Sequence, residues 1–215
     1  MRGPSVRLAT ARGRSASSQR WLTRQLNDPY VAGAKAEGWR SRSAFKLMEL
    51  DGRFHLLGRG KRVIDLGAAP GGWSQVALKR GAACVVGVDL LPVDPLAGAT
   101  FVQGDFTDPE MPAKLAALME GKADVVLSDM APNTTGHAST DHLRILALAE
   151  LALAFAAEVL APGGAFVCKL FQGGAERQLL TAMQQRFAGV RHAKPPASRK
   201  ESSELYVIAT GFRGA

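Results

Sequence analysis

The stretch that decides the fold spans residues 62 to 75 and reads RVIDLGAAPGGWSQ. Its apolar beginning, 62–66, predicts a short buried strand. The glycines that follow predict a tight turn, because glycine adopts backbone conformations that other residues avoid. Residues 73–79 then predict a helix. A strand, a glycine-rich turn and a helix in this order form the first unit of an α/β sheet.

The rest of the chain repeats this alternation. Apolar runs predict further strands at 83–89, 99–103, 124–128, 165–171 and 204–210. Helical patterns predict helices at 109–119, 141–160 and 175–187. Strands that alternate with helices form a mostly parallel sheet with helices on both faces. We therefore predict a doubly wound α/β domain, whose ligands bind at the carboxyl ends of the strands.

Composition and charge narrow the class of protein. Hydrophobic residues make up 47% of the chain, which is enough for a buried core, and the net charge of +8 favours a polyanionic partner such as nucleic acid. Cys84 and Cys168 lie in apolar strands without CxxC spacing, so we expect reduced, buried thiols. The histidines have no ligand spacing, and we expect no metal site. No apolar run is long and uncharged enough to predict a membrane span.

The segment before the first strand predicts a tail and two helical stretches. Residues 1–20 are rich in Arg, Gly and Ser and predict a flexible basic tail, followed by one domain at 21–215. A helical pattern begins at Trp21, is interrupted at 27–29, and resumes at Ser43. Because the tail has arginines and no acid, it fits either a mitochondrial transit peptide or a disordered arm that touches RNA. We favour the arm.

Acidic residues at successive strand ends predict a nucleoside-binding site. Asp65 stands before the glycine-rich turn, Asp89 ends the next strand, and Asp105 ends the one after it. Asp89 is placed to accept hydrogen bonds from ribose hydroxyls, and Asp105 to hold an adenine amino group beside Phe106. The turn is not the G-x-G-x-x-G of dinucleotide binders, so a ligand without a pyrophosphate suits it better.

Two further strand ends predict the reaction site. Residues 127–133 read LSDMAPN and lack the aromatic residue with which base-amino methyltransferases stack on a flipped base. Lys169 lies inside an apolar strand, where lysine is rare unless it is paired. Burial and a neighbouring cation favour a neutral amine, which makes this lysine a candidate general base. The alternative is an edge-strand lysine that reaches water.

Together these segments resemble the FtsJ/RlmE family of ribosomal RNA large subunit 2′-O-ribose methyltransferases. The resemblance runs from about Trp21 to Gly211 and rests on seven motifs: SRSAFKL, DLGAAPGGWSQ, VDLLP, QGDF, LSDMAPN, FVCKLFQG and SSELYVIATG. It implies a Rossmann-like class I methyltransferase fold with a mostly parallel seven-stranded sheet. It also implies a catalytic Lys-Asp-Lys-Glu tetrad at Lys46, Asp129, Lys169 and Glu204.

The resemblance further implies a cofactor and a substrate. The cofactor is S-adenosyl-L-methionine, with contacts expected at Gly71, Trp73, Asp89, Asp105 and Asp129. The substrate is a uridine ribose in 23S ribosomal RNA of the large subunit, with Lys169 as general base. We expect Arg40, Arg42 and the basic stretch 191–200 to hold the RNA, and we expect a monomer in the cytoplasm, or in the mitochondrial matrix if the tail is a transit peptide.

Three other functions compete with this interpretation. The first is methylation of another acceptor, such as a small-molecule hydroxyl or a base nitrogen. The second is a non-catalytic RNA-binding ribosome-assembly factor with a vestigial cofactor pocket. The third is an NAD-dependent oxidoreductase, which the spacing of the glycines disfavours. The complete tetrad weighs against the vestigial pocket, because such a site has no reason to keep two buried lysines.

Overall fold

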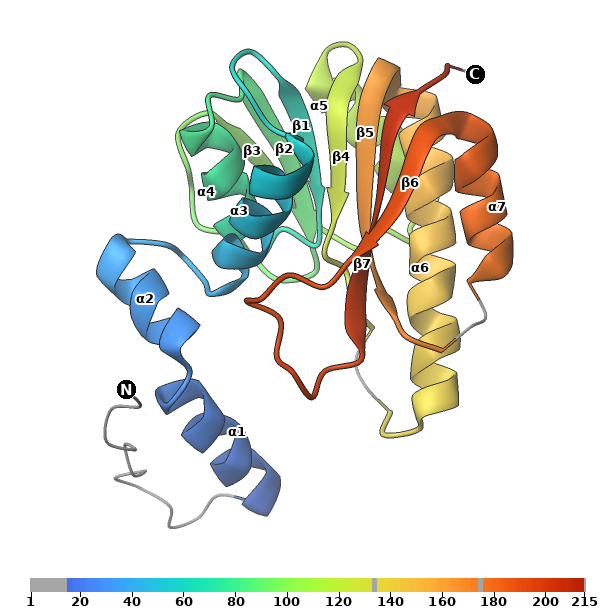
Figure 1. Cartoon of the computed structure of the whole chain (residues 1–215). Helices are drawn as coiled ribbons and strands as arrows, with labels where there is room; N and C mark the ends of the chain where they lie inside the picture. The colour runs from blue at the N-terminus through green and yellow to red at the C-terminus, as the bar shows by residue number, and fades with distance from the viewer. Residues whose placement is uncertain (1–14, 133–134, 174–175, 215) are drawn as a thin grey trace.

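The computed structural model describes residues 15–132, 135–173 and 176–214, and these form an α/β fold around one seven-stranded sheet (Figure 1). The strand order is β3-β2-β1-β4-β5-β7-β6. The strands are β1 (Arg62–Leu66), β2 (Cys84–Asp89), β3 (Ala99–Gln103), β4 (Ala123–Ser128), β5 (Leu160–Phe171), β6 (Phe187–Ala193) and β7 (Glu204–Phe212).

Helices cover both faces of this sheet (Figure 1). The helices are α1 (Ala16–Leu26), α2 (Pro29–Glu37), α3 (Ser43–Phe54), α4 (Gly72–Lys79), α5 (Met111–Met119), α6 (Ala138–Val159) and α7 (Arg177–Arg186). Apolar side chains of α3 and α4 pack on one face of the sheet, and those of α5, α6 and α7 pack on the other. The sheet is therefore the middle of three layers. Within the described ranges, none of the helices is both long and apolar enough to cross a membrane.

The direction of the strands places the site. Strands β1 to β5 pair in parallel, whereas β7 runs antiparallel between β5 and β6. From β1 the chain proceeds outward through β2 and β3 and then crosses to β4 on the other side. Such a reversal leaves a crevice at the carboxyl ends of β1 and β4, where ligands of these folds bind. The predicted Rossmann-like, mostly parallel sheet is confirmed.

The boundaries of several predicted elements differ from those observed. Helix α1 begins at Ala16, five residues before the predicted start at Trp21 and within the segment predicted to be a flexible tail. The Ser15 side chain accepts a hydrogen bond from Ser18 N and caps the helix. Residues 1–14 of that tail lie outside the described residues. Helix α6 begins at Ala138 rather than residue 141, and β5 begins at Leu160 rather than residue 165.

One strand and one helix of the fold were not predicted from the sequence. Strand β6 starts at Phe187, where a helix was predicted to end. It is an edge strand that pairs only with β7, and its exposed Arg191 and His192 interrupt any apolar pattern. Helix α2 begins at Pro29, the last residue of the predicted interruption, because Asp28 caps it by accepting from Tyr30 N and Pro29 occupies its first position.

A segment between β6 and β7 ties the sheet to the N-terminal helices. The Ala197 peptide donates its N–H to Glu49 of α3 and accepts from Arg42. Asp28 pairs with Arg42 at 3.1 Å and with Arg199 at 3.4 Å. These contacts hold residues 194–203 against α2 and α3, directly before β7 begins with Glu204.

Candidate active site

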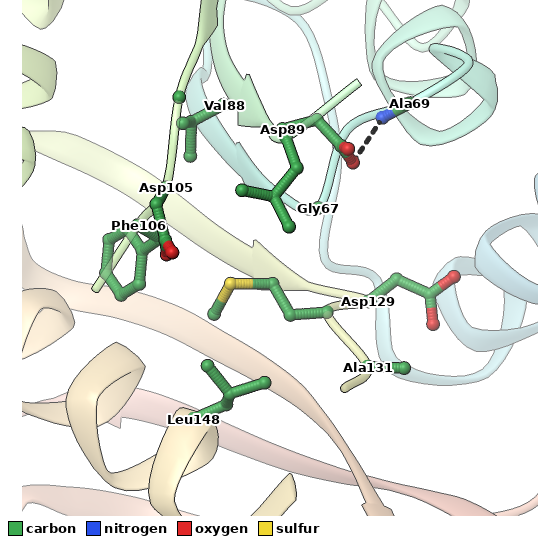
Figure 2. Close-up of a pocket in the computed structure, with 12 residues that line it drawn as sticks. Gly67, Ala69, Val88, Asp89, Asp105, Phe106, Asp129, Ala131 and Leu148 are labelled. Carbon is green, nitrogen blue, oxygen red and sulfur yellow. Dashed lines mark hydrogen bonds between the residues drawn. The ribbon is translucent and has the colours of Figure 1, made fainter. Parts of the chain in front are cut away.

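A cavity of about 290 Å³ opens at the carboxyl ends of the parallel strands (Figure 2). Its lining comes from the ends of β1, β2, β3 and β4 and from α6, and consists of Gly67, Ala69, Val88, Asp89, Leu90, Gly104, Asp105, Phe106, Asp129, Met130, Ala131 and Leu148. Three of the predicted site residues, Asp89, Asp105 and Asp129, therefore share one cavity. It lies at the crevice that the sheet topology predicts.

The turn after β1 brings the backbone close to this cavity. Gly67 has a φ of 83°, and a Cβ at this position would lie 2.8 Å from the backbone nitrogen of Met130. Only glycine fits such a conformation and such an approach. Asp89 stabilises the turn, because its Oδ2 accepts from Ala69 N at 2.9 Å and its Oδ1 accepts from Leu91 N at 2.9 Å. Each oxygen keeps a second lone pair for a ligand hydroxyl.

Asp105 presents a carboxylate to the cavity from the end of β3. Its Oδ1 accepts from the backbone and the hydroxyl of Thr107, and these hydrogen bonds hold the pKa of Asp105 below its usual value. The carboxylate therefore stays ionised and acts as an acceptor. Phe106 next to it is 6% exposed and packs edge-on against Phe155, so it forms an apolar wall between Asp105 and α6.

Gly71 and Trp73 do not line this cavity. Gly71 has a φ of 103°, and a Cβ there would meet the Arg40 guanidinium at 2.7 Å. The Trp73 side chain is 2% exposed, donates from its indole N–H to Ser43 O at 2.9 Å, and packs against the Tyr206 ring. Both residues contact the segment that enters α3, Gly71 near Arg40 and Trp73 at Ser43.

Next to the cavity, five side chains form one continuous polar array: Lys169, Asp129, Tyr206, Lys46 and Glu204. Lys169 Nζ donates to Asp129 Oδ1 at 3.0 Å and to the Asp129 carbonyl. Tyr206 donates to the same Oδ1 at 2.7 Å and accepts from Lys46 Nζ at 3.3 Å. Lys46 completes the polar array by pairing with Glu204 at 2.7 Å. The structure thus brings the four residues of the predicted tetrad together.

Secondary structure explains this convergence. Asp129 follows β4, and its N–H donates to Leu66 O at the end of β1. Lys169 and Tyr206 face each other as a pair in the antiparallel β5–β7 ladder, and Glu204 lies two residues earlier on the same face of β7. Lys46 reaches the polar array from the first turn of α3.

The charges of the polar array are balanced at Asp129. Burial alone would raise the pKa of this carboxyl, but Lys169, Lys46 and the Tyr206 hydroxyl together hold it below its usual value. Burial and the charges of Asp129 and Glu204 raise the pKa of Tyr206 well above 10, so its hydroxyl keeps its proton. Lys46 and Lys169 are 8% and 9% exposed, which excludes the alternative of a lysine that reaches freely into water.

The sequence analysis did not identify Tyr206, although it occupies the centre of the polar array. The signal was the period-2 alternation of β7, which places residues 204 and 206 on the same face. Tyr206 is completely buried, and its hydroxyl has two polar partners. A tyrosine two residues after the predicted tetrad member Glu204 was therefore a candidate on strand geometry alone.

The two arginines predicted to contact RNA have partners inside the protein. The Arg40 guanidinium donates to the carbonyls of Pro70, Asp94 and Pro95. Arg42 pairs with Asp28 and donates to Ala197 O. Both guanidinium groups therefore hold loops together around the site. Exposed cations of the predicted basic stretch, including Arg191 and Lys200, lie outside these contacts.

Cys168 is completely buried in β5, and burial raises the pKa of its thiol. The other cysteine, Cys84, is half-buried at the start of β2, with its Sγ near the Met119 sulfur. Across residues 15–132, 135–173 and 176–214, the structure contains no cluster of three His, Cys, Asp or Glu side chains placed to hold a metal ion.

Comparisons with known proteins agree on the family. The model of FtsJ-like methyltransferases matches residues 39–212. A relative from Granulibacter bethesdensis, named ribosomal RNA large subunit methyltransferase E, is 74% identical and covers 99% of this chain and 92% of its own. A relative of the same name from Gluconobacter oxydans is 68% identical, covering 99% of this chain and 79% of its own.

Among solved structures, one supports the same family and another shares the fold alone. A protein from Plasmodium falciparum assigned as a ribosomal RNA methyltransferase superposes with a TM-score of 0.73 at 31% identity, over 82% of this chain and 100% of its own. A protein from Streptococcus thermophilus assigned as a hemolysin, 20% identical with a TM-score of 0.58 over 82% of this chain and 68% of its own, shares the fold alone. The family match over residues 39–212, together with these relatives, shows that the chain belongs to the FtsJ-like methyltransferases.

Proposed function

We propose that this methyltransferase uses S-adenosyl-L-methionine to methylate the ribose 2′-hydroxyl of a uridine in 23S ribosomal RNA. The name shared by its relatives supports a substrate in the RNA of the large ribosomal subunit. The observation that carries the proposal is the polar array of Lys169, Asp129, Tyr206, Lys46 and Glu204 at the wall of the cavity. A lysine positioned next to a reacting hydroxyl can take part in proton transfer, as methylation of a ribose hydroxyl requires.

The cavity suits the proposed cofactor. Asp89 offers free lone pairs to ribose hydroxyls, and Asp105 offers an ionised acceptor beside the apolar wall of Phe106. Asp129 contributes to both the cavity and the polar array, so a cationic methyl donor would lie beside a carboxylate. When bound, S-adenosyl-L-methionine supplies an electrophilic methyl group on a sulfonium.

Lys169 is placed to accept the proton of the attacking hydroxyl. In this proposal Lys169 is uncharged at the moment of reaction, and a neutral lysine amine has two N–H donors and one lone pair. Asp129 provides two acceptors for Lys169 Nζ, its carboxylate and its carbonyl, so both donors of the neutral form are satisfied. The lone pair then remains for the 2′-proton. Lys46, fixed by Glu204 and Tyr206, orients the hydroxyl, and positioning supplies most of the rate enhancement.

The RNA is held mainly by electrostatics in this proposal. Arg40 and Arg42 already serve carbonyls and a carboxylate of the protein, so the exposed cations of residues 191–200 carry the contacts to phosphate. We further propose that the protein acts as a monomer in the cytoplasm, where large ribosomal subunits are its substrate.

Methyl transfer to RNA tests the proposal. Large subunits and naked 23S RNA would be incubated with radiolabelled S-adenosyl-L-methionine and digested to nucleosides. We expect label in 2′-O-methyluridine. Lys169→Ala should abolish turnover while cofactor affinity stays within about twofold, because it removes the base without changing the cavity. Lys122→Ala, directly before β4 and thus at the opposite end of the strands, is the control and should retain activity.

Two outcomes contradict this proposal. Turnover retained in Lys169→Ala would remove this residue from the role of base. An absence of label on both substrates, with the cofactor still bound, would favour a different acceptor or the assembly-factor interpretation.

A further inference from the structure

The Trp73 side chain joins two parts of the polar array. Its indole N–H donates to the carbonyl of Ser43, the first residue of α3, and Lys46 follows three residues later in the same turn. Its ring packs on the Tyr206 ring, with the centroids 5.6 Å apart and the planes at 41°. At 2% exposure, the side chain is enclosed by these neighbours and lies outside the cavity lining.

Other contacts near Trp73 also join the start of α4 to the segment that enters α3, and we call this contact region the junction. Gln75, two residues further along α4, accepts from Arg40 N at 2.9 Å and donates to Gly38 O at 2.8 Å. Gly72 lies so close to Ser41 that a Cβ would be only 2.3 Å from its Oγ. The start of α4 and the segment entering α3 are thus joined side by side. Because α4 begins at the turn that borders the cavity, this junction connects the cavity to Lys46.

We infer that Trp73 is a positioning residue, which together with Gln75 fixes Lys46 and Tyr206 relative to the cofactor cavity. The inference rests on the proposed function. It assigns a role to the buried Trp73 side chain, beside the cofactor contact predicted for this residue, and to Gln75, which had no predicted role. A displacement of about 1 Å at a reacting group costs about 100-fold in rate, so the loss of one anchoring hydrogen bond has a measurable effect on turnover.

The test compares two tryptophans that belong to the same apolar cluster. Trp73→Phe keeps an aromatic ring against Tyr206 and removes the indole N–H that holds Ser43. Trp39→Phe is the matched control, since its indole N–H donates to the exposed Glu37 side chain and makes no contact with the polar array. For each variant, kcat and KM are measured with 23S RNA, cofactor affinity by calorimetry, and the melting temperature by circular dichroism.

We expect Trp73→Phe to lower kcat by about tenfold or more while the Kd of the cofactor changes less than twofold. Trp39→Phe should leave both unchanged. A Kd that rises in proportion to the loss of activity would overturn the inference and make the Trp73 side chain a cofactor contact. Unchanged kcat would overturn it as well.

A second variant covers the case in which Trp73→Phe fails to fold. Gln75→Ala loosens the same junction from a half-buried position and should also lower kcat without changing cofactor Kd. If this variant retains full kcat, the junction does not position Lys46. Wild-type protein is assayed first, since a wild type that transfers no methyl group refutes the proposed function, whereas an active wild type with fully active variants refutes the positioning role alone.

Discussion

At the scale of single residues, Asp129 connects the cavity at the strand ends to the lysines. Its carboxylate lines the cavity and accepts hydrogen bonds from both Lys169 and Tyr206. One buried carboxylate thus offsets part of the charge of two buried lysines, whose burial would otherwise cost several kcal/mol. Glu204 offsets the rest by its contact with Lys46. This balance explains how a strand interior accommodates Lys169.

Tyr206→Phe tests the centre of this balance. The substitution keeps the ring against Trp73 and removes one donor to Asp129, so the pKa of Asp129 should rise toward its usual value. A lowered carboxyl pKa contributes stability above about pH 4 that is lost as the pH falls. Thermal unfolding above pH 4 should therefore show a loss of about 1–3 kcal/mol, together with lower kcat.

Tyr30→Phe is the control for that experiment. The Tyr30 hydroxyl lies 3.5 Å from Glu49, away from the polar array, and its loss should leave kcat unchanged. An equal loss of kcat in both variants would mean that the hydroxyl of Tyr206 has no special role.

Asp65 gives a prediction on pH dependence. It is completely buried, Ser74 donates to its Oδ2 at 2.6 Å, and its Oδ1 has no hydrogen-bond partner among the described residues. Burial raises the pKa of Asp65 to about 7. Between about pH 4 and pH 7 the folded protein therefore keeps a proton that the unfolded chain has released, and the free energy of unfolding falls as pH rises through this window.

Asp65→Asn removes this titration and keeps an acceptor for Ser74. The variant should match the wild type near pH 4 and exceed it at pH 8, by up to about 4 kcal/mol for a shift of three pKa units. Urea unfolding of both proteins at several pH values measures the difference. Parallel curves from pH 4 to pH 8 would show that Asp65 ionises normally.

At the scale of elements, the turn between β1 and α4 has the least freedom to change. Gly67→Ala places a methyl group 2.8 Å from the Met130 backbone at a φ of 83°, so it should destabilise the fold by about 1–3 kcal/mol and weaken cofactor binding. Gly52→Ala is the matched control in α3. No atom would lie within 4 Å of its Cβ, and we expect stabilisation of about 0.5–1 kcal/mol by the higher helix propensity of alanine.

The sequence predicted elements whose pattern is regular and missed those that depend on tertiary contacts. The strands that become β1 to β4 and the turn after β1 carry continuous apolar or glycine signals, and they are confirmed. Strand β6 carries no such signal, since its place at the edge of the sheet depends on pairing with β7 and on a few core contacts such as that of Phe187. At the site, the motifs identified the polar residues but not the directions of their side chains. Trp73 was predicted to contact the cofactor and Arg40 to contact RNA, and nothing in the sequence indicated that both side chains also donate to carbonyl groups of the protein.

At the scale of the whole molecule, the net charge of +8 is expected to act mainly through the exposed cations of residues 191–200, at the end of β6 and in the segment that leads to β7. The double variant Arg191→Ala, Lys200→Ala should weaken RNA binding and reduce the slope of log K against log salt by about 1–2, since each lost phosphate contact contributes about 0.7–0.9. Filter binding at several salt concentrations measures the slope. Lys114→Ala, on α5, is the control, and an equal effect there would indicate a general charge effect.

The position of β7 also determines when the enzyme becomes active during its own synthesis. Strand β7 is the last strand in sequence order, yet it lies between β5 and β6 and carries both Glu204 and Tyr206. Domains emerge from the N-terminus at about 5–20 residues per second, so the first five strands can pair while residues up to Phe212 are still being translated. Until β7 has been made, β6 has no strand to pair with, and Lys46 lacks its contacts with Glu204 and Tyr206. A nascent chain therefore cannot complete the polar array before Glu204 and Tyr206 of β7 have been made.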